Sequence, residues 1–222
     1  MAAPAENTIA NLNGIWAMDK SLSNPMEPLL TLQGISWVTR KGLTLATLTL
    51  HVNQYTDSDN VPHVDIDQTI TGGIKGTSER RIADWQGREH KDHIFGTVVG
   101  RSRFLRGSKR DNGTVRPDVD VQTPVDDEKV ESFLRGEVLA DGSETEGFLV
   151  DEGVGQGFGD GEGLWFQSFV ENQDPGYEWT AEQIWGFEMV NGERRYTRRI
   201  AVAKDGQYEL VRFVYDFQGP TQ

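Results

Sequence analysis

Cysteine is absent from this sequence of 222 residues, and that absence excludes several structures and chemistries. Without a thiol there can be no disulfide, no cysteine nucleophile and no Cys-ligated zinc. Long hydrophobic runs are missing as well, because no stretch approaches the roughly 18 apolar residues of a membrane-spanning helix. The first dozen residues also lack the basic start and apolar centre of a secretory signal. We therefore expect a cytoplasmic protein with no membrane insertion, and we expect residues 1–12 to form a polar tail.

Positive charge is scarce relative to negative charge. Lys and Arg number 22 against 35 for Asp and Glu, which gives a formal net charge of -13 and a pI near 4.7. Such a surface repels phosphate backbones and anionic membranes. Nucleic acid is therefore not expected as a partner, whereas the oligomeric state stays open, a homodimer included.

Sequence signatures of the common catalytic centres are also lacking. No Ser-His-acid grouping, nucleophile elbow or zinc motif occurs in the sequence. The row His63, Asp65 and Asp67 has the residue types of a metal or proton-transfer site, but it also fits the solvated side of a half-buried strand, and we favour the second interpretation. We expect no cofactor and no bound metal ion.

What the sequence does contain, from Thr47 onward, is an alternation of apolar and polar residues with a period of two. Asn191-Gly192 and Asp205-Gly206 separate alternating runs and are typical of tight hairpin turns between antiparallel neighbours. We predict an all-β fold, an antiparallel up-and-down β-barrel of about ten strands. The predicted strands are 47–55, 62–71, 76–85, 91–104, 129–139, 144–151, 163–171, 177–189, 193–203 and 207–217.

Three segments depart from this alternation. Residues 25–46 carry apolar residues at three- and four-residue spacing, and Gly34 divides them, so we predict a short helix-turn-helix cap. Residues 107–128 are polar and aperiodic, which indicates a surface insertion. Residues 153–163 are rich in glycine and acids with no helix after them, so we predict a mobile loop and no phosphate cradle. The whole chain, 1–222, is expected to be a single β-barrel domain.

The order of these features resembles a known family. The chain has Gly14-x-Trp16, then a helical cap ending in Trp37, Thr39, Arg40 and Lys41, and later the stretch QIWGFEMVNGERRYTRRIAVAKDGQYELV. In this it is similar to the intracellular fatty-acid-binding proteins of the calycin superfamily. The resemblance implies a barrel around a cavity for one hydrophobic small molecule.

Two departures limit what the resemblance implies. The chain is longer than a typical member, with the excess at 107–163, and Arg212 and Tyr215 are three residues apart where the family has an Arg-x-Tyr pair. Residues three apart on a strand face opposite sides, so we do not expect Arg212 and Tyr215 to bind a carboxylate together in one lumen. In size and style the chain is also similar to lipocalin-like pericyclases of fungal natural-product pathways, such as the hetero-Diels–Alderases of tropolone sesquiterpenoids.

The second likeness implies a cofactor-independent enzyme of specialised metabolism that directs a cyclisation or a (hetero-)Diels–Alder cycloaddition of a hydrophobic, oxygen-bearing substrate. A non-catalytic carrier of fatty acid, terpenoid or other lipophile is the alternative. A third hypothesis is a β-domain that binds a protein partner and no small ligand.

Polar residues inside apolar rows are the candidate catalytic groups. Gln183 interrupts an aromatic row, and Arg198 has apolar neighbours on its own strand face, where an unpaired guanidinium would be costly. Arg212 and His51 raise the same question, although each of the two arginines is equally explained by a structural ion pair. We predict that Arg198, Arg212, Gln183 and His51 polarise substrate oxygens.

Aromatic side chains are the candidate walls of the cavity, although for any single one of them ordinary core is the commoner role. Strand 163–171 is apolar on both faces, so its inward face cannot be chosen from the sequence. The predicted substrate-binding residues are Trp37, Tyr55, Trp165, Phe169, Tyr177, Trp179, Trp185, Phe187, Tyr196 and Tyr208.

Overall fold

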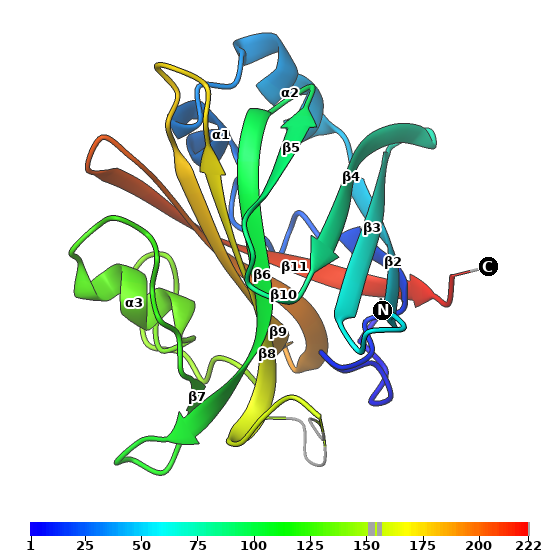
Figure 1. Ribbon diagram of the computed structural model, residues 1–222, viewed down its shortest axis with the longest axis vertical. Coiled ribbons are helices and arrows are strands. Elements are labelled where there is room, and N and C mark those ends of the chain that lie inside the picture. Colours follow the sequence, from blue (N-terminus) through cyan, green and yellow to red (C-terminus); the bar gives the residue numbers. More distant parts are fainter. Residues whose placement is uncertain (151–153, 155–156, 222) are drawn as a thin grey trace.

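The computed structural model describes residues 1–150, 154 and 157–221, and its main feature is one strongly curved antiparallel sheet (Figure 1). The strands are β1 (Gly14–Met18), β2 (Leu48–Thr56), β3 (Pro62–Ile70), β4 (Ile74–Ile82), β5 (Arg88–Asp92), β6 (Gly96–Lys109), β7 (Val115–Pro117), β8 (Glu162–Asn172), β9 (Thr180–Val190), β10 (Glu193–Lys204) and β11 (Gln207–Gly219). The helices are α1 (Glu27–Leu32), α2 (Trp37–Leu45) and α3 (Glu128–Leu134).

The strand order curls the sheet into a barrel that stays open along one line. Neighbouring strands follow the order β4-β3-β2-β1-β11-β10-β9-β8-β6-β5, with β7 added beside β6. The first strand thus pairs with the last, and Trp16 lies opposite Phe217. Within the described residues no ladder joins β4 to β5, so these two consecutive strands form the open seam. The predicted antiparallel up-and-down barrel of about ten strands is confirmed, with an opening between β4 and β5.

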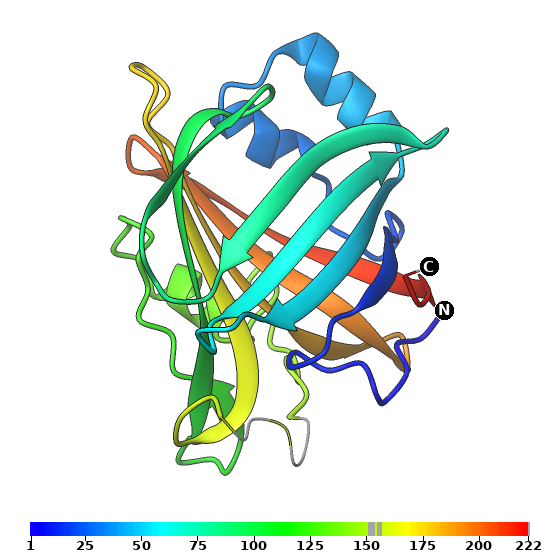
Figure 2. The same cartoon turned by 45° about the vertical axis from the view of Figure 1, so that its right-hand side comes forward.

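The predicted helix-turn-helix cap is confirmed as α1 and α2, which lie across the upper end of the curled sheet (Figure 2). Gly34 links the helices with a φ of +75°, a conformation that favours glycine. Ser36 begins α2, because its hydroxyl accepts a hydrogen bond from the Thr39 amide at 3.3 Å. Leu29 and Leu30 of α1 point into the barrel, whereas α2 has no buried residue.

The hairpins follow the predicted turns, with one addition. Asn191 and Asp205 have φ values of 50° and 51°, as tight hairpin turns require. The segment predicted as one strand at 91–104 is instead the hairpin β5 and β6. Its turn forms because the Asp92 carboxylate accepts hydrogen bonds from the amides of Ile94 and Phe95.

The segment between β6 and β8 differs most from the prediction. The expected strand at 129–139 is wrong, because residues 128–134 form α3, and the described part of the expected strand 144–151 contributes only isolated bridges, at Glu144 and Phe148. Position 151 lies outside the described residues. Asp127 caps α3 by accepting a hydrogen bond from the Lys129 amide at 2.9 Å. Val130, Phe133 and Leu134 recur at helical spacing and are all buried. This spacing was the signal for a helix, and the alternation of the neighbouring strands obscured it.

Residues 107–150, which we call the insertion from here on, cover the outer face of β8 to β11, so that part of the sheet has a core on each side. The outer core packs Phe133 and Phe148 against Trp165 and Ile184. Gly186 permits this contact, since a Cβ atom there would lie 2.5 Å from the Phe148 ring. The inner core contains Trp16, Phe166 and Trp185 among many others. The apolar character of both faces of 163–171 therefore has a structural cause.

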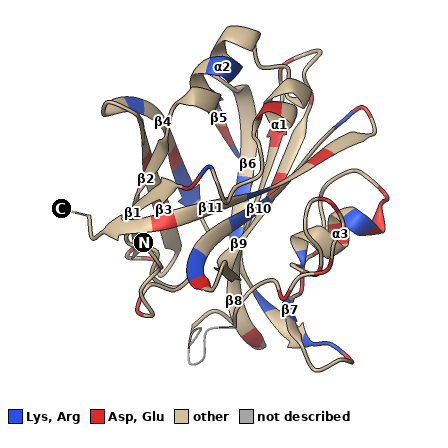
Figure 3. Cartoon of the chain, turned by 180° about the vertical axis from the view of Figure 1, so that it is seen from behind, with Lys and Arg blue, Asp and Glu red and all other residues tan. Residues whose placement is uncertain are grey.

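A buried ion network lies within this outer layer, where Figure 3 shows basic segments of β10 and β11. The Glu188 carboxylate is 2.9 Å from Nη1 of Arg212 and 2.8 Å from Nε of Arg199. Arg199 also donates hydrogen bonds to the carbonyls of Phe133 and Val138, which ties the insertion to the sheet. On the face of β9 opposite the aromatic row, Glu182 and Glu188 are both buried.

Two segments that were predicted to be irregular, residues 1–12 and 153–163, differ from the prediction. Residues 1–12 are not a free polar tail, because Ile9 and Leu12 are buried and the Leu12 carbonyl accepts a hydrogen bond from Nε1 of Trp16. Of the glycine-rich loop predicted at 153–163, positions 153, 155 and 156 lie outside the described residues, 157–161 form no helix or strand, and the last two residues already belong to β8. No helix in the described part of the chain is both long and apolar enough to cross a bilayer.

Candidate functional site

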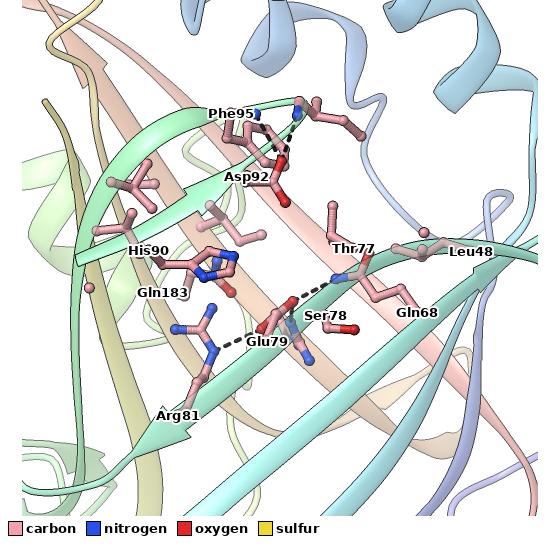
Figure 4. Close-up of a pocket in the computed structure, with 18 of the residues that line it drawn as sticks. Leu48, Gln68, Thr77, Ser78, Glu79, Arg81, His90, Asp92, Phe95 and Gln183 are labelled. Atoms are coloured by element: carbon pink, nitrogen blue, oxygen red, sulfur yellow. Dashed lines mark hydrogen bonds and ion pairs between the residues drawn. The ribbon is translucent and has the colours of Figure 1, made fainter. Parts of the chain in front are cut away.

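A cavity of about 530 Å³ lies inside the curled sheet beneath α1 and α2 (Figure 4). Its walls are mainly apolar and come from strands on every side of the barrel together with the cap. Representative wall residues are Leu30, Leu50, Phe95, Val98, Ile200 and Phe213. A space of this size and lining is typical of sites for hydrophobic small molecules.

Polar side chains also line the cavity, and we call five of them the polar cluster: Gln68, Glu79, Arg81, Gln183 and Arg198. Glu79 is their centre. Its carboxylate lies 2.8 Å from Nε of Arg81 and 3.6 Å from Nη1 of Arg198, and it accepts a hydrogen bond from the Gln68 amide at 2.7 Å. Three different strands, β3, β4 and β10, therefore meet at one carboxylate.

The two guanidinium groups keep Glu79 ionised. Burial by itself raises the pKa of this carboxyl, but the attraction of Arg81 and Arg198 outweighs burial and lowers its pKa from 4.5 to about 2. The pKa of Arg198 is raised, because the neighbouring Tyr196 and Glu79 outweigh the opposing effect of burial. Burial also raises the pKa of the Tyr215 phenol to about 12. At neutral pH the polar cluster thus contains two cations and one anion.

Arg198 is held in place without using all of its donors. Its side chain is 4% exposed, its guanidinium stacks 3.9 Å from the centre of the Trp185 ring, and its Nε donates to the Tyr196 hydroxyl at 3.0 Å. Its Nη2 is buried and has no hydrogen-bond partner among the described residues. A buried donor without a partner is costly, and an oxygen atom of a bound ligand would satisfy it.

Three of the residues predicted from the sequence line this cavity: Arg198, Gln183 and Trp179. The Gln183 carbonyl oxygen accepts a hydrogen bond from Nε1 of Trp185 at 2.9 Å, which fixes the amide. Trp185, Phe187 and Tyr196 lie on the inner face of the sheet, as the alternation indicated, but they form packed core around the cavity. Figure 4 shows Gln183 beside Arg81 and Glu79.

Two of the predicted polar residues lie outside the cavity. Arg212 is on the outer face of β11, where it pairs with Glu188. The insertion covers this face and buries the Glu188 network. His51 is also on an outer face, where its Nε2 lies 3.2 Å from the Thr69 hydroxyl. Leu50 and Val52 occupy the inner face of β2 instead. The expectation that Arg212 and His51 reach the lumen is wrong.

Six of the predicted aromatic residues lie outside the cavity as well. Trp37 is 63% exposed on α2, and Tyr55 and Tyr177 are also exposed. Trp165 and Phe169 are buried on the outer face of β8. The Tyr208 hydroxyl donates a hydrogen bond to Asp127 at the start of α3. Trp165 and Tyr208 share one physical reason, since the insertion creates an apolar outer layer that the sequence does not separate from the lumen.

Sequence reasoning missed Gln68, Glu79, Arg81 and His90, all of which line the cavity. The run Ser78-Glu79-Arg80-Arg81 reads as a solvated charged strand. In this run Glu79 and Arg81 face the cavity, and Arg80 between them pairs with Asp67 on the outer face. The one available signal was the placement of an acid and a base two apart on the same face. Within the described residues no group of three or more metal-ligating side chains occurs.

Acidification is expected to destabilise the native protein through Glu79. Because the folded pKa of about 2 lies below the ordinary 4.5, the ionised carboxylate contributes stability that is complete above about pH 4.5 and is lost as the pH falls through the folded pKa. Urea unfolding between about pH 5 and about pH 2 should show a steeper loss for the native chain than for Glu79→Gln. Parallel curves for the two proteins would contradict this assignment.

The comparisons with known proteins agree with this geometry. No family model matches the chain. A protein of Mollisia scopiformis named "Probable pericyclase scpY" is 26% identical over 220 residues, which covers 99% of this chain and 96% of that protein. "Pericyclase pydY" of an Acremonium species is 24% identical over 221 residues, which covers 99% and 98%. The chain is similar to pericyclases along its whole length.

Solved structures provide the fold. The apo lipid binding protein 8 of Caenorhabditis elegans aligns with a TM-score of 0.50 at 11% identity, over 93% of this chain and 95% of that one. Fatty-acid-binding protein 1 of Echinococcus granulosus aligns at 12% identity with a TM-score of 0.48, over 93% and 97%. The likeness to the first of these, at such low identity, concerns the fold alone. It confirms the calycin-like barrel that the sequence predicts.

Proposed function

We propose that this chain is a cofactor-independent pericyclase of fungal-type specialised metabolism, acting in the cytoplasm on a hydrophobic, oxygen-bearing small molecule bound in the barrel cavity. The reaction we propose is a cyclisation of the (hetero-)Diels–Alder type. Its support is the full-length similarity to two proteins named pericyclases, together with the composition of the cavity.

The observation that carries the proposal is that Nη2 of Arg198, inside a mainly apolar cavity, has no hydrogen-bond partner in the described part of the chain. A cationic donor that hydrogen-bonds a carbonyl oxygen withdraws electron density from the conjugated double bond, which makes that bond a better cycloaddition partner. In surroundings of low dielectric constant, such a fixed donor stabilises developing negative charge much more than water does. Gln183, fixed by Trp185, is the second group that we propose to bind substrate oxygen.

The walls supply the second part of the proposed mechanism. A cycloaddition within one molecule requires a flexible chain to fold so that diene and dienophile approach each other. Trp179 and the aliphatic wall residues bury that chain and select compact conformers. Holding reacting groups in register can contribute roughly 7–11 kcal/mol in well-aligned cases.

In the experiment, the recombinant chain is produced in its native host, and the small molecule that co-purifies with it is extracted and used as the substrate. A cycloaddition within one molecule loses and gains no atoms, so the product must have the same mass as the substrate and a different retention time. We expect the extracted ligand to give such an isomer much faster with the protein than with buffer. The matched control is His51→Gln, which changes an outer-face residue and should retain full activity.

Two results would overturn the proposal. Recovery of the ligand unchanged, with no isomer formed above the rate in buffer, would indicate a carrier. Loss of activity in His51→Gln to the same extent as in cavity variants would show that the assay reports folding and not the site.

A further inference from the structure

His90 of β5 is the one imidazole that lines the cavity among the described residues. Its place follows from the strand register, since it pairs with Val98 of β6, and Val98 faces the cavity. Paired residues of antiparallel strands point to the same side of the sheet. Figure 4 shows the His90 ring pointing into the cavity toward Glu79, Arg81 and Gln183.

The imidazole has no structural task in the described part of the chain. Neither ring nitrogen takes part in a hydrogen bond or an ion pair there, in contrast to His51, which is bonded to Thr69, and His63, which is bonded to Asp57. His90 is also exposed, because β5 is one edge of the open seam. An unengaged imidazole at the mouth of an apolar cavity is suited to moving a proton, the commonest chemical role of histidine.

The other side chains of the polar cluster complement such a base. Glu79 is a poor base, since Arg81 and Arg198 hold its pKa near 2. The same two guanidinium groups exceed the negative charge of Glu79 by one, so the cluster stabilises an additional anion. An enolate is an anion whose charge lies on an oxygen, which is the atom that the free Nη2 of Arg198 can bind.

We infer that the substrate is an enolisable carbonyl compound and that His90 removes its α-hydrogen as a general base. The inference rests on the proposed function, because it concerns the same cavity and the same substrate. The α-carbon to hydrogen bond breaks, the proton passes to a ring nitrogen of His90, and the electron pair moves to the carbonyl oxygen held by Arg198. The imidazolium then returns the proton to the oxygen or to the γ-carbon, and no oxidant or reductant is consumed. With a β,γ-unsaturated ketone the result is a conjugated dienol or enone, which is a cycloaddition partner.

Hydrogen exchange of a simple ketone tests this directly. Methyl nonyl ketone serves as the probe in deuterated water, with α-deuteration followed by mass spectrometry and binding followed by quenching of tryptophan fluorescence. We expect the native chain to exchange the α-hydrogens faster than buffer, and His90→Gln to lower that rate by about 10²- to 10⁴-fold, the usual contribution of a general base. His90→Gln should bind the ketone as the native chain does, and His51→Gln should exchange normally.

Two outcomes overturn the inference: a native chain that does not bind the ketone or does not exchange its α-hydrogens, and a His90→Gln variant that exchanges at the native rate. The co-purified ligand separates this result from the proposed function. If the native chain converts that ligand into an isomer but exchanges no α-hydrogens, the pericyclase proposal stands and the inference about His90 falls. If exchange occurs and no isomer forms, the proton transfer stands and the pericyclase proposal falls.

Discussion

Arg198→Met is expected to lower turnover at saturating substrate by about 10²- to 10³-fold, the effect of removing one well-placed donor to a developing oxyanion. Methionine retains much of the length and packing of the arginine stem and loses the charge and all donors. The loss should appear in kcat, because the hydrogen bond strengthens as negative charge develops on the substrate oxygen. Steady-state kinetics on the co-purified ligand, with isomer formation as the readout, measure it.

A control on the same strand separates this effect from a general loss of charge. Arg195 of β10 is three residues away and faces outward, where it pairs with Glu193 and Asp216. Arg195→Met should retain native kcat. Glu79 keeps its partner Arg81 at 2.8 Å in the Arg198→Met variant, so its carboxylate is not left uncompensated. If Arg198→Met alters only affinity and leaves kcat unchanged, Arg198 anchors the ligand and does not polarise it.

The largest stability effect is expected for Glu188→Gln, at about 3–5 kcal/mol of unfolding free energy. The substitution keeps the shape of the side chain and removes the negative charge that compensates Arg199, which is fully buried, and Arg212. The remaining guanidinium groups are held between the sheet and α3, where water cannot solvate them fully. Urea or guanidinium unfolding at neutral pH measures the difference.

Glu171→Gln is the matched control for burial. Glu171 is also on the outer face and also pairs with an arginine at 2.8 Å, Arg101, but its side chain is 39% exposed. An ion pair of similar geometry in solvent contributes about 0–1 kcal/mol. Equal losses in Glu188→Gln and Glu171→Gln would show that burial is not what makes the Glu188 network important.

The alternation of β9 and β10 made their inner faces predictable, and the alternation of β2 and β8 did not. On β9 the aromatic residues share one face with Gln183, and on β10 Arg198 lies between apolar neighbours, so both were placed correctly. On β2 the apolar face of Leu50 and Val52 was passed over in favour of His51, whose polar chemistry suggested a function that its position rules out. On β8 both faces are apolar because both are covered, and no period can separate two cores.

The polar cluster shows a limit of another kind. Arg198 could be found because an arginine in an apolar row requires a partner. Its partner, Glu79, is more than a hundred residues earlier in a strand that reads as solvated, and the two meet only because β4 and β10 face each other across the barrel. A pairing between opposite walls depends on curvature and register together. Curvature and register each depend on many residues at once. The Glu79–Arg198 pair therefore cannot be predicted from the sequence of either strand alone.

The insertion over β8 to β11 gives the barrel two walls of different stiffness. The strands under it have tightly packed side chains above and below, so they resist bending, and they carry Gln183 and Arg198. The opposite wall is one layer thick and ends in two unpaired edges, β4 and β5, which carry Glu79, Arg81 and His90. The donors that must be aimed accurately are thus set in the rigid wall. If the cavity changes shape around a bound ligand, we expect β4 and β5, in the more flexible opposite wall, to move.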